Sequence, residues 1–455
     1  RPVRRLIGPA RGPSPRLGNG AGARPVACGS VTEPAPTAPS GRLPALDAVR
    51  AFALLAGVVL HSTLAWVMPP GQWGVGTDRP DLVLWAFTHY VHGFRMQLFF
   101  LLAGFFAALV VSRRGTRAYV RDRAVRIGLV FVVFVYPLKL LVSIPWIAGG
   151  LKTGWLELPP EVARLPLLGL AIGGLFQEQW PNVSPAHLWF LYYLLLVTGL
   201  FLGLRWAWGR RPRPGAPGRL SSASAALALL VAHPLGPVVL AVPLVLLLRL
   251  TPTGVLASPD RGLVPEWPAL AVFGSCFAFG WWLFSRRGLL DAFARWWPGW
   301  IGASLVAMAG AALLELQLRT AGLGPGGHWL AAVANALILT FAALGWTGLF
   351  VARCSAPSPV VRYLADASYW VYLVHLPVVV ATQVWVSDWT FRPAQLLVVN
   401  VVTFAVSLAS YHWLVRDSPL GQWLNGRRHP RRRAGPSGSP PAGPGHPRTP
   451  TESHR

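Results

Sequence analysis

Ten long apolar stretches alternate with short polar or proline-bearing connectors along this sequence. A bilayer core about 30 Å thick is crossed by about 20 helical residues, and each stretch has about 18–25. The pattern therefore predicts an all-α, polytopic integral membrane protein with about ten transmembrane helices. The predicted spans are residues 46–67, 90–111, 124–143, 187–208, 228–250, 268–285, 299–319, 328–351, 367–386 and 395–415.

Three segments fit this pattern less well. The stretch 228–250 contains three prolines, which interrupt helix interiors. The stretch 299–319 contains an acidic residue, Glu315. Residues 163–176 are apolar but number only 14, so we expect a re-entrant or interfacial piece there rather than a span.

The two ends of the chain lack any apolar period. Residues 1–43 begin with arginine rather than methionine and are rich in Arg, Pro, Gly and Ser, which predicts a disordered basic arm without assigned function. Residues 426–455 combine five closely spaced arginines with a Pro/Gly/Ser run. We expect a disordered basic tail that contacts an anionic membrane surface. The transmembrane domain is therefore predicted to span residues 44–425.

Composition supports a membrane protein and excludes two other classes. Of 455 residues, 53% are hydrophobic and 13% are charged, whereas soluble domains carry about 25% charged residues. Too little polar surface remains to cover a soluble particle, so an ordinary cytosolic or secreted enzyme is excluded, and so is a disordered protein. The expected location is the cell (inner or plasma) membrane, as a multi-pass protein.

The net charge of +25 comes from 41 basic and 16 acidic residues. Such an excess can indicate nucleic-acid binding, but in so apolar a chain the positive-inside rule explains it better. Arginines gather in alternate connectors, and the connectors between them are close to charge-balanced. This alternation predicts that both termini are cytoplasmic and that no nucleic acid is bound. The arginine-rich set comprises both termini and Arg113, Arg114, Arg117, Arg121, Arg123, Arg205, Arg210, Arg211, Arg213, Arg219, Arg286, Arg287, Arg295, Arg353, Arg362 and Arg416.

Sequence motifs of soluble enzymes are absent. The chain has no GxxxxGK[ST], HExxH or GxSxG motif, and Cys28, Cys276 and Cys354 are too scattered for a disulfide framework or a metal site. We expect no metal and no permanently bound cofactor. Chemistry is therefore sought among polar residues inside the spans, where an ionisable group faces the bundle interior or a water-filled cavity.

The first span carries two ionisable residues eleven positions apart, Arg50 and His61. This separation is about three helical turns, so both side chains share one face and lie about 16 Å apart along the axis. Arg50 lies near the predicted cytoplasmic end and His61 in the outer half. The alternative is structural: Arg50 ends the helix and His61 hydrogen-bonds a neighbouring helix.

Three further arginines stand near predicted helix ends. Arg95 lies at the outer entrance to the second span. Arg123 and Arg126 lie at the inner mouth of the third span, and their spacing makes them face the same way on a helix. Paired guanidinium groups bind phosphates through bidentate, charge-assisted hydrogen bonds. Positive-inside topology is the alternative, and it is our explanation for the other arginines of that connector.

The fourth and ninth spans add polar groups. His187 opens the fourth span within an aromatic stretch that is typical of a membrane interface. Tyr369, Tyr372 and His375 follow one another at i, i+3 and i+6, so they form a polar ridge on one flank of the ninth span. Interhelical hydrogen bonding is the alternative explanation for this ridge.

Together these residues resemble the acyltransferase-3 family of bacterial membrane acyltransferases, in particular its glucan biosynthesis protein C branch, which modifies periplasmic glucans. The resemblance covers residues 44–425 and rests on the order of the motifs within the ten-span frame. The motifs are Arg50-x10-His61, Phe99-Phe-Leu-Leu-Ala-Gly104-Phe-Phe, Arg123-x-x-Arg126, His187-Leu-Trp-Phe-Leu and Ser368-Tyr-Trp-Val-Tyr-Leu-Val-His375-Leu-Pro. One departure is Ala103, where family members often have serine.

The resemblance implies transfer of an acyl group, of acetyl or succinyl type, from cytoplasmic acyl-CoA to a hydroxyl of an extracytoplasmic glycan or glycolipid. His61 matches the family's catalytic histidine, and Arg50 matches its partner. Arg123 and Arg126 match the pair on the CoA side. This chemistry needs a base, because a sugar hydroxyl is a poor nucleophile, and histidine suits that role near neutral pH.

Substrate-binding residues are then expected toward the outer side of the bundle, where the acceptor would enter. The lipid bilayer, acyl-CoA and the glycan or glycolipid are the expected partners. The predicted substrate-binding residues are Arg95, His187, Tyr372 and His375.

A secondary transporter is the alternative function. Its proton or substrate relay would use Arg50, His61 and His375. Transporters often consist of two related halves, and the Arg50/His61 pattern has no counterpart in the second half of this chain.

Overall fold

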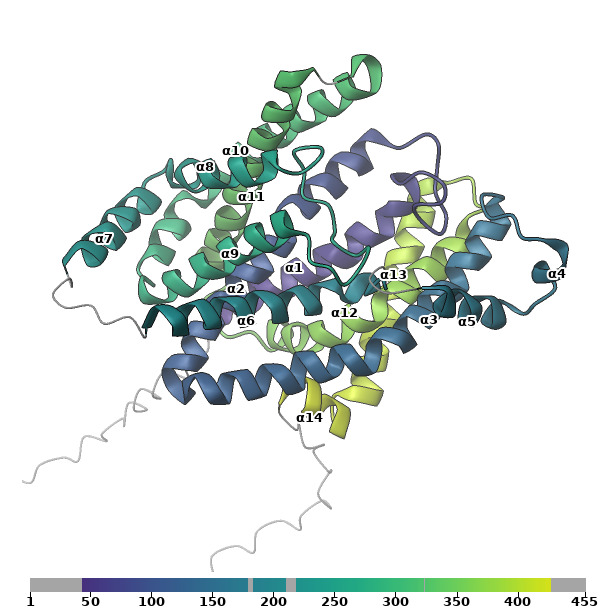
Figure 1. Cartoon of the computed structure of the whole chain (residues 1–455), viewed down its shortest axis with the longest axis horizontal. Coiled ribbons are helices and arrows are strands. Elements are labelled where there is room, and N and C mark those ends of the chain that lie inside the picture. The colour runs from purple at the N-terminus through teal and green to yellow at the C-terminus, as the bar shows by residue number, and fades with distance from the viewer. Residues whose placement is uncertain (1–42, 179–182, 210–217, 323, 427–455) are drawn as a thin grey trace, which may run out of the picture. The chain divides into compact units, whose positions relative to one another are not determined.

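The computed structural model describes residues 43–178, 183–209, 218–322 and 324–426. Every named element in this part of the chain is a helix (Figure 1). The predicted basic arm and tail lie almost entirely outside the described residues. The α-helices are α1 (Pro44–Thr63), α2 (Leu82–Arg123), α3 (Leu129–Thr153), α4 (Pro160–Ala163), α5 (Leu167–Gln177), α6 (Trp189–Gly209), α7 (Gly218–Ala232), α8 (Gly236–Arg249), α9 (Trp267–Ser285), α10 (Leu289–Ala321), α11 (Pro325–Arg353), α12 (Pro359–Val386), α13 (Arg392–Ser410) and α14 (Pro419–Asn425).

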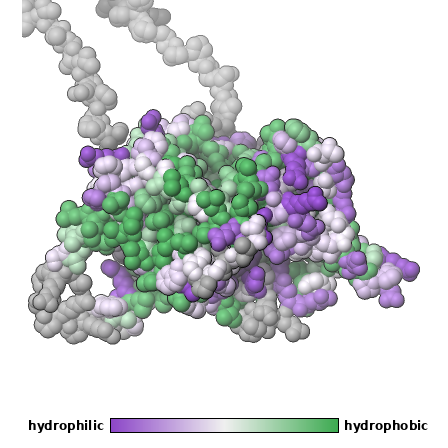
Figure 2. Space-filling model, turned by 90° about the horizontal axis from the view of Figure 1, so that it is seen from above, coloured by the Kyte–Doolittle hydropathy of each residue, from purple (hydrophilic) through white to green (hydrophobic). Residues whose placement is uncertain are grey.

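Membrane-length helices dominate the described residues. Eight are long and apolar enough to cross a bilayer, and a bent pair raises the number to nine. The predicted all-α, polytopic fold is confirmed, whereas the number of crossings and the sides of the termini stay predictions. Large apolar side chains such as Val132, Leu313 and Trp413 are exposed, as expected of side chains that face lipid. Figure 2 shows hydrophobic side chains covering much of one face.

One of the eight candidates runs from Leu82 to Thr153, over 72 residues. At 1.5 Å per residue it would be about 110 Å long, more than three bilayer cores. Gly115 interrupts it with φ 79° and ψ 164°, a conformation that glycine adopts without steric cost. Figure 1 shows the chain turning back after α2 into α3. The second and third predicted spans lie on the two sides of this glycine.

The prediction of one helix over residues 228–250 is wrong. The segment is a pair of helices, α7 and α8, and the chain bends by 109° between them. Pro234 falls at the bend, where its ring removes a backbone donor and blocks continuation of the helix. By contrast, the stretch 299–319 lies within one helix, α10, and the apolar residues 163–176 contribute the short helix α5.

Helices α2 and α9 approach so closely that their backbones touch. A side chain on Gly104 would overlap the carbonyl of Phe277, and one on Gly280 would overlap the carbonyl of Leu101. These pairings run in opposite directions along the two helices, so α2 and α9 are antiparallel. Glycines at such positions allow close van der Waals packing, which drives helix association in lipid.

We predict that Gly280→Val lowers the stability of the folded protein, whereas Gly274→Val on the same helix does not. A branched side chain at Gly280 meets the α2 backbone, and overpacking of this kind costs about 1–3 kcal/mol or more. Gly274 has open space where its Cβ would stand. Thermal unfolding of both variants in detergent or nanodiscs measures the difference. Equal Tm values for the two variants would contradict the helix pairing.

Candidate active site

Two histidines from helices α1 and α12 meet inside the bundle. His61 Nδ1 lies 2.8 Å from His375 Nε2, and the two rings stack with centroids 5.0 Å apart. His375 is only 3% exposed. Its Nδ1 lies 2.8 Å from the carbonyl oxygen of Tyr372 and 3.1 Å from that of Val371, both on its own helix. Sequence spacing did not reveal that these histidines touch, because they lie 314 positions apart.

A third histidine, His187, packs beside this pair. Its ring lies 5.9 Å from the ring of His375, and its Nε2 donates to the carbonyl of Leu373 at 3.1 Å. That carbonyl is available because Pro377, four residues further along α12, has no N–H to bond it. The hydroxyl of Tyr372 donates to the carbonyl of His187 at 2.7 Å. The predicted residues His61, His187, Tyr372 and His375 therefore form one cluster.

Arg95, on α2, contacts α1 one helical turn before His61. Its guanidinium rests on Gly57 of α1, where any side chain would overlap it. The Arg95 charge acts on both His61 and His375. Its Nε is buried without a hydrogen-bond partner, and no carboxylate of the described residues forms an ion pair with it. Arg95 is therefore a cation available to an anionic group of a substrate.

Arg95 lies further into its helix than the predicted span 90–111 indicates, whereas its position relative to the membrane stays a prediction. Helix α2 begins at Leu82, thirteen residues and about 20 Å earlier, so Arg95 lies within the bundle. The side chain of Asp81 caps this start by accepting from the N–H groups of Val83 and Leu84, both at 3.0 Å. The apolar pattern alone placed the span too late because residues 82–92 include several polar side chains.

Arg50 contacts α12 near the N-terminal ends of both α1 and α12. Its Nη2 donates to the carbonyl of Ala365 at 3.0 Å, and it lies 3.6 Å from Asp47. Since α1 is continuous and both Arg50 and His61 contact α12, the two share one face of α1, as their spacing predicts. Residues 365 and 375 follow the same order as residues 50 and 61, so the two helices run parallel.

Arg123 and Arg126 flank one carboxylate. Arg123 Nη2 lies 2.8 Å from Asp122 Oδ2, and Arg126 Nε lies 3.0 Å from Asp122 Oδ1. Residues 124–128 form a π-helical turn, and the carbonyl of Arg126 accepts from the hydroxyl of Tyr369 at 2.6 Å. The pair is therefore tied to α12 between Ala365 and the histidine cluster.

Two polar residues that the sequence analysis missed hold the histidine end of α1. The side chain of Gln383 donates to the carbonyls of His61 at 3.2 Å and Ser62 at 3.0 Å, and it accepts from the indole of Trp73 at 2.8 Å. Gln383 follows His375 by about two turns, so an amide inside a span was a usable signal. Trp73 lies in a connector and carried no signal.

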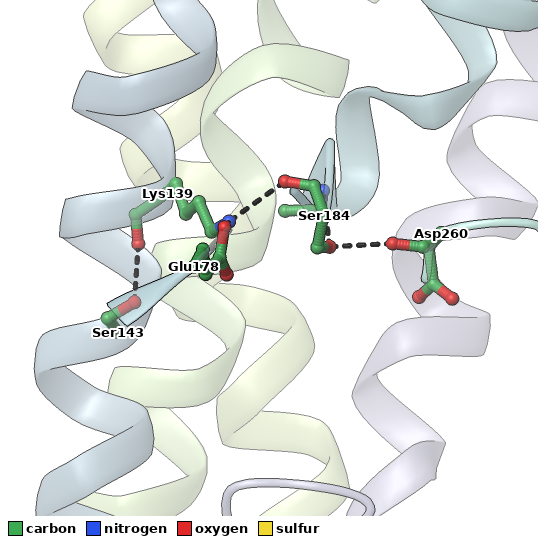
Figure 3. Close-up of polar contacts among 6 residues, drawn as sticks. Lys139, Ser143, Glu178, Ser184 and Asp260 are labelled. Atoms are coloured by element: carbon green, nitrogen blue, oxygen red, sulfur yellow. Dashed lines mark hydrogen bonds and ion pairs between the residues drawn. The ribbon is translucent and has the colours of Figure 1, made fainter. Parts of the chain in front are cut away.

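A buried lysine anchors the segment that leads to His187. Lys139 of α3 is 7% exposed, forms an ion pair with Glu178, and donates to the carbonyl of Ser184 at 2.9 Å (Figure 3). The hydroxyl of Ser184 then donates to the carbonyl of Asp260 at 2.6 Å. Because an ionisable residue inside a span is costly, Lys139 could have been singled out from the sequence. Its contacts fix the approach to His187, three residues after Ser184.

A cavity of about 210 Å³ opens beside the histidine end of α1. It is lined in part by Gln383, whose side chain bonds the carbonyl of His61. Its other walls combine aromatic, aliphatic, hydroxyl and amide side chains with one glycine and one arginine. They include Trp66, Thr77, Trp389, Arg392 and Gln395.

Among the described residues, no group of three or more His, Cys, Asp or Glu side chains is placed to hold a metal ion. Instead, His61 bonds to His375, and the rings of His375 and His187 bond to backbone carbonyls. Their arrangement suits proton transfer and hydrogen bonding to a substrate.

Comparison with known protein families decides the class of the protein. The sequence model of an acyltransferase domain matches residues 43–412, most of the chain. The chain belongs to the acyltransferase-3 family. It is therefore a membrane acyltransferase, and the predicted family and enzyme class are confirmed.

Curated relatives within this acyltransferase family carry the name glucans biosynthesis protein C. Those of Salmonella paratyphi B and Salmonella heidelberg are each 26% identical over 194 residues. The match covers 38% of this chain and 42% of the relative, so it spans less than half the length of these proteins. No solved structure matches the chain.

We predict that Gln383→Met lowers both stability and acyl transfer, whereas Thr382→Val leaves them close to wild type. Methionine keeps the volume but leaves the buried indole N–H of Trp73 without its acceptor, at about 1–3 kcal/mol, and it removes the amide bonds to the carbonyls of His61 and Ser62. Thr382 bonds only a carbonyl of its own helix. Thermal unfolding and acyl transfer, measured on the same preparations, check both effects. An unchanged Tm for Gln383→Met would contradict this role.

Proposed function

We propose that this membrane acyltransferase moves an acetyl- or succinyl-type group from cytoplasmic acyl-CoA to a hydroxyl of an extracytoplasmic glycan or glycolipid. The name of the curated relatives supports a glucan as the acceptor. The observation that carries the proposal is the buried contact of His61 with His375, one helical turn from the unpaired guanidinium of Arg95.

Acyl transfer needs a base and a group that stabilises negative charge. In the proposed step the acceptor hydroxyl oxygen attacks the thioester carbonyl carbon, and His61 takes the hydroxyl proton. Negative charge then develops on the carbonyl oxygen, and a preorganised cation such as Arg95 stabilises it. The C–S bond breaks, the C–O bond of the new ester remains, and the proton passes from His61 to the CoA thiolate.

The donor side of the proposal follows α12. CoA phosphates would bind the guanidinium pair of Arg123 and Arg126 through charge-assisted hydrogen bonds. From there the pantetheine arm would pass Arg50 and reach His61, about 16 Å away along α1. Arg50 and the backbone of Arg126 both contact this helix, which supports one continuous path.

The acceptor side of the proposal uses His187 and the cavity at the end of α1, which Gln383 lines. His187 donates through Nε2, so the neutral ring carries its lone pair on Nδ1. This Nδ1 is buried without a hydrogen-bond partner and can accept from a sugar hydroxyl. The cavity combines the faces of two tryptophans with hydroxyl groups and an arginine, a mixture that suits a polyhydroxylated ring.

The family assignment favours an enzyme over the secondary transporter that the sequence left open. Reconstitution in liposomes distinguishes the two. The acyltransferase consumes acyl-CoA supplied on one side and releases free CoA, with the acyl group recovered on the glycan. Transport of substrate without formation of an ester would overturn the proposal.

We predict that His61→Ala reduces acyl transfer by about 10²–10⁴-fold, the usual contribution of a general base. His412→Ala serves as the matched control because His412 is exposed at the end of α13 and is expected to retain activity. Release of CoA is measured for both variants in liposomes, after equal insertion and Tm have been verified. Retained transfer in a folded His61→Ala protein would refute the catalytic assignment.

We predict that replacing Arg123 and Arg126 together by glutamine raises the KM for acyl-CoA about tenfold or more and leaves kcat nearly unchanged. Loss of charge-assisted phosphate contacts weakens donor binding, and tenfold corresponds to about 1.4 kcal/mol. The control replaces Arg113 and Arg114, which are exposed in the same basic segment. Steady-state kinetics over a range of acyl-CoA concentrations separates KM from kcat. An equal rise in KM for both double variants would contradict a specific phosphate site.

A further inference from the structure

The surroundings of His375 determine which of its nitrogens carries hydrogen. Its Nδ1 faces two backbone carbonyl oxygens, at 2.8 Å from Tyr372 and 3.1 Å from Val371. A carbonyl oxygen only accepts hydrogen bonds, so Nδ1 must be the protonated nitrogen. In a neutral imidazole the other nitrogen, Nε2, then carries the lone pair.

The contact with His61 extends this assignment by one ring. Nε2 of His375 lies 2.8 Å from Nδ1 of His61, and two lone pairs cannot face each other at that distance. Nδ1 of His61 is therefore the donor, and Nε2 of His61 holds the lone pair. Nδ1–H of His375 therefore donates to the α12 backbone, and Nδ1–H of His61 donates to Nε2 of His375. The basic nitrogen that remains is Nε2 of His61.

A charged form of His375 would reverse this order, and its surroundings do not support one. No carboxylate of the described residues bonds to either ring, and Arg95 already places a positive charge within electrostatic range of both. A second buried cation would lack a counter-ion, which is unfavourable in a water-poor interior. The backbone carbonyls are also fixed by α12, so the ring cannot change its tautomer without losing both bonds.

We propose that His375 is a positioning residue for His61, in addition to lining the site. This inference rests on the proposed acyl transfer. His375 holds His61 in the tautomer whose Nε2 accepts the proton of the acceptor hydroxyl. When Nε2 of His61 is protonated, Nδ1–H of His61 still donates to the lone pair on Nε2 of His375. The His61 ring therefore does not turn during the step. The proton then leaves Nε2 for the CoA thiolate as the C–S bond breaks.

The same logic is known from catalytic triads, where an orienting group fixes the tautomer of the histidine base and its loss costs about 10⁴-fold in kcat with the geometry otherwise intact. In this protein a neutral acceptor, His375 Nε2, stands where a triad has a carboxylate. A neutral acceptor provides less stabilisation to the imidazolium, so a smaller cost of about 10²-fold is expected.

Single substitutions at His375 separate positioning from substrate binding. His375→Leu removes the acceptor at similar volume and is expected to lower kcat about 10²-fold with little change in either KM. His375→Gln restores an acceptor oxygen for His61 Nδ1 and is expected to recover part of the lost kcat. A rise in the KM for the acceptor at unchanged kcat, or equal kcat values for the two variants at equal Tm, would overturn the proposal.

A double-mutant cycle with His61 provides the second test. If His375 acts through His61, then His375→Leu causes no further loss of transfer once His61 is alanine. Additive losses would show that His375 acts on the substrate independently and would overturn the positioning role. Failure of the proposed function itself looks different, because the wild-type protein would then form no ester from acyl-CoA.

Discussion

The contact between α1 and α12 is the interaction on which the candidate site depends. The two helices are joined at three heights by polar bonds: Arg50 to Ala365, His61 to His375, and the end of α1 to Gln383. Lipid provides no hydrophobic force between helices, so packing and hydrogen bonds such as these must hold them together. Two of the three bonds involve residues with proposed chemical roles, which means that association of the helices and assembly of the site are the same event.

Arg95 illustrates how the bundle accommodates a charge with which no carboxylate in the described part of the chain forms an ion pair. A guanidinium inside a membrane protein is unfavourable, and Gly57 reduces steric conflict without supplying a counter-ion. The apolar surroundings that make this charge costly also strengthen its attraction to any anionic group that arrives. Local strain of this kind is common at functional sites, where part of the stability is exchanged for preorganisation.

Hydropathy was sufficient to predict the fold class and most helix positions, because a span must be long and apolar wherever it lies in the bundle. Helical spacing likewise placed Arg50 and His61 on one face, since that relation is local. Three features could not be predicted in this way. The position of Arg95 within α2 depends on a helix start that Asp81 caps and that polar side chains follow. The bend at Pro234 interrupts an otherwise apolar run, and the contact of His61 with His375 depends on the packing of distant helices. The functional residues were thus recognisable singly, but their partners were visible only in three dimensions.

The parallel course of α1 and α12 also fixes the length of the chain between their contacts. The first two contacts are eleven residues apart on α1 and ten on α12, so the two rises, about 16 Å and 15 Å, nearly match. Inserting or deleting one residue in either interval would rotate the far contact by about 100°, turning His61 or His375 away from its partner while leaving hydropathy unchanged. The site therefore requires the number of residues between these contacts on each helix, as well as the residues that make the contacts.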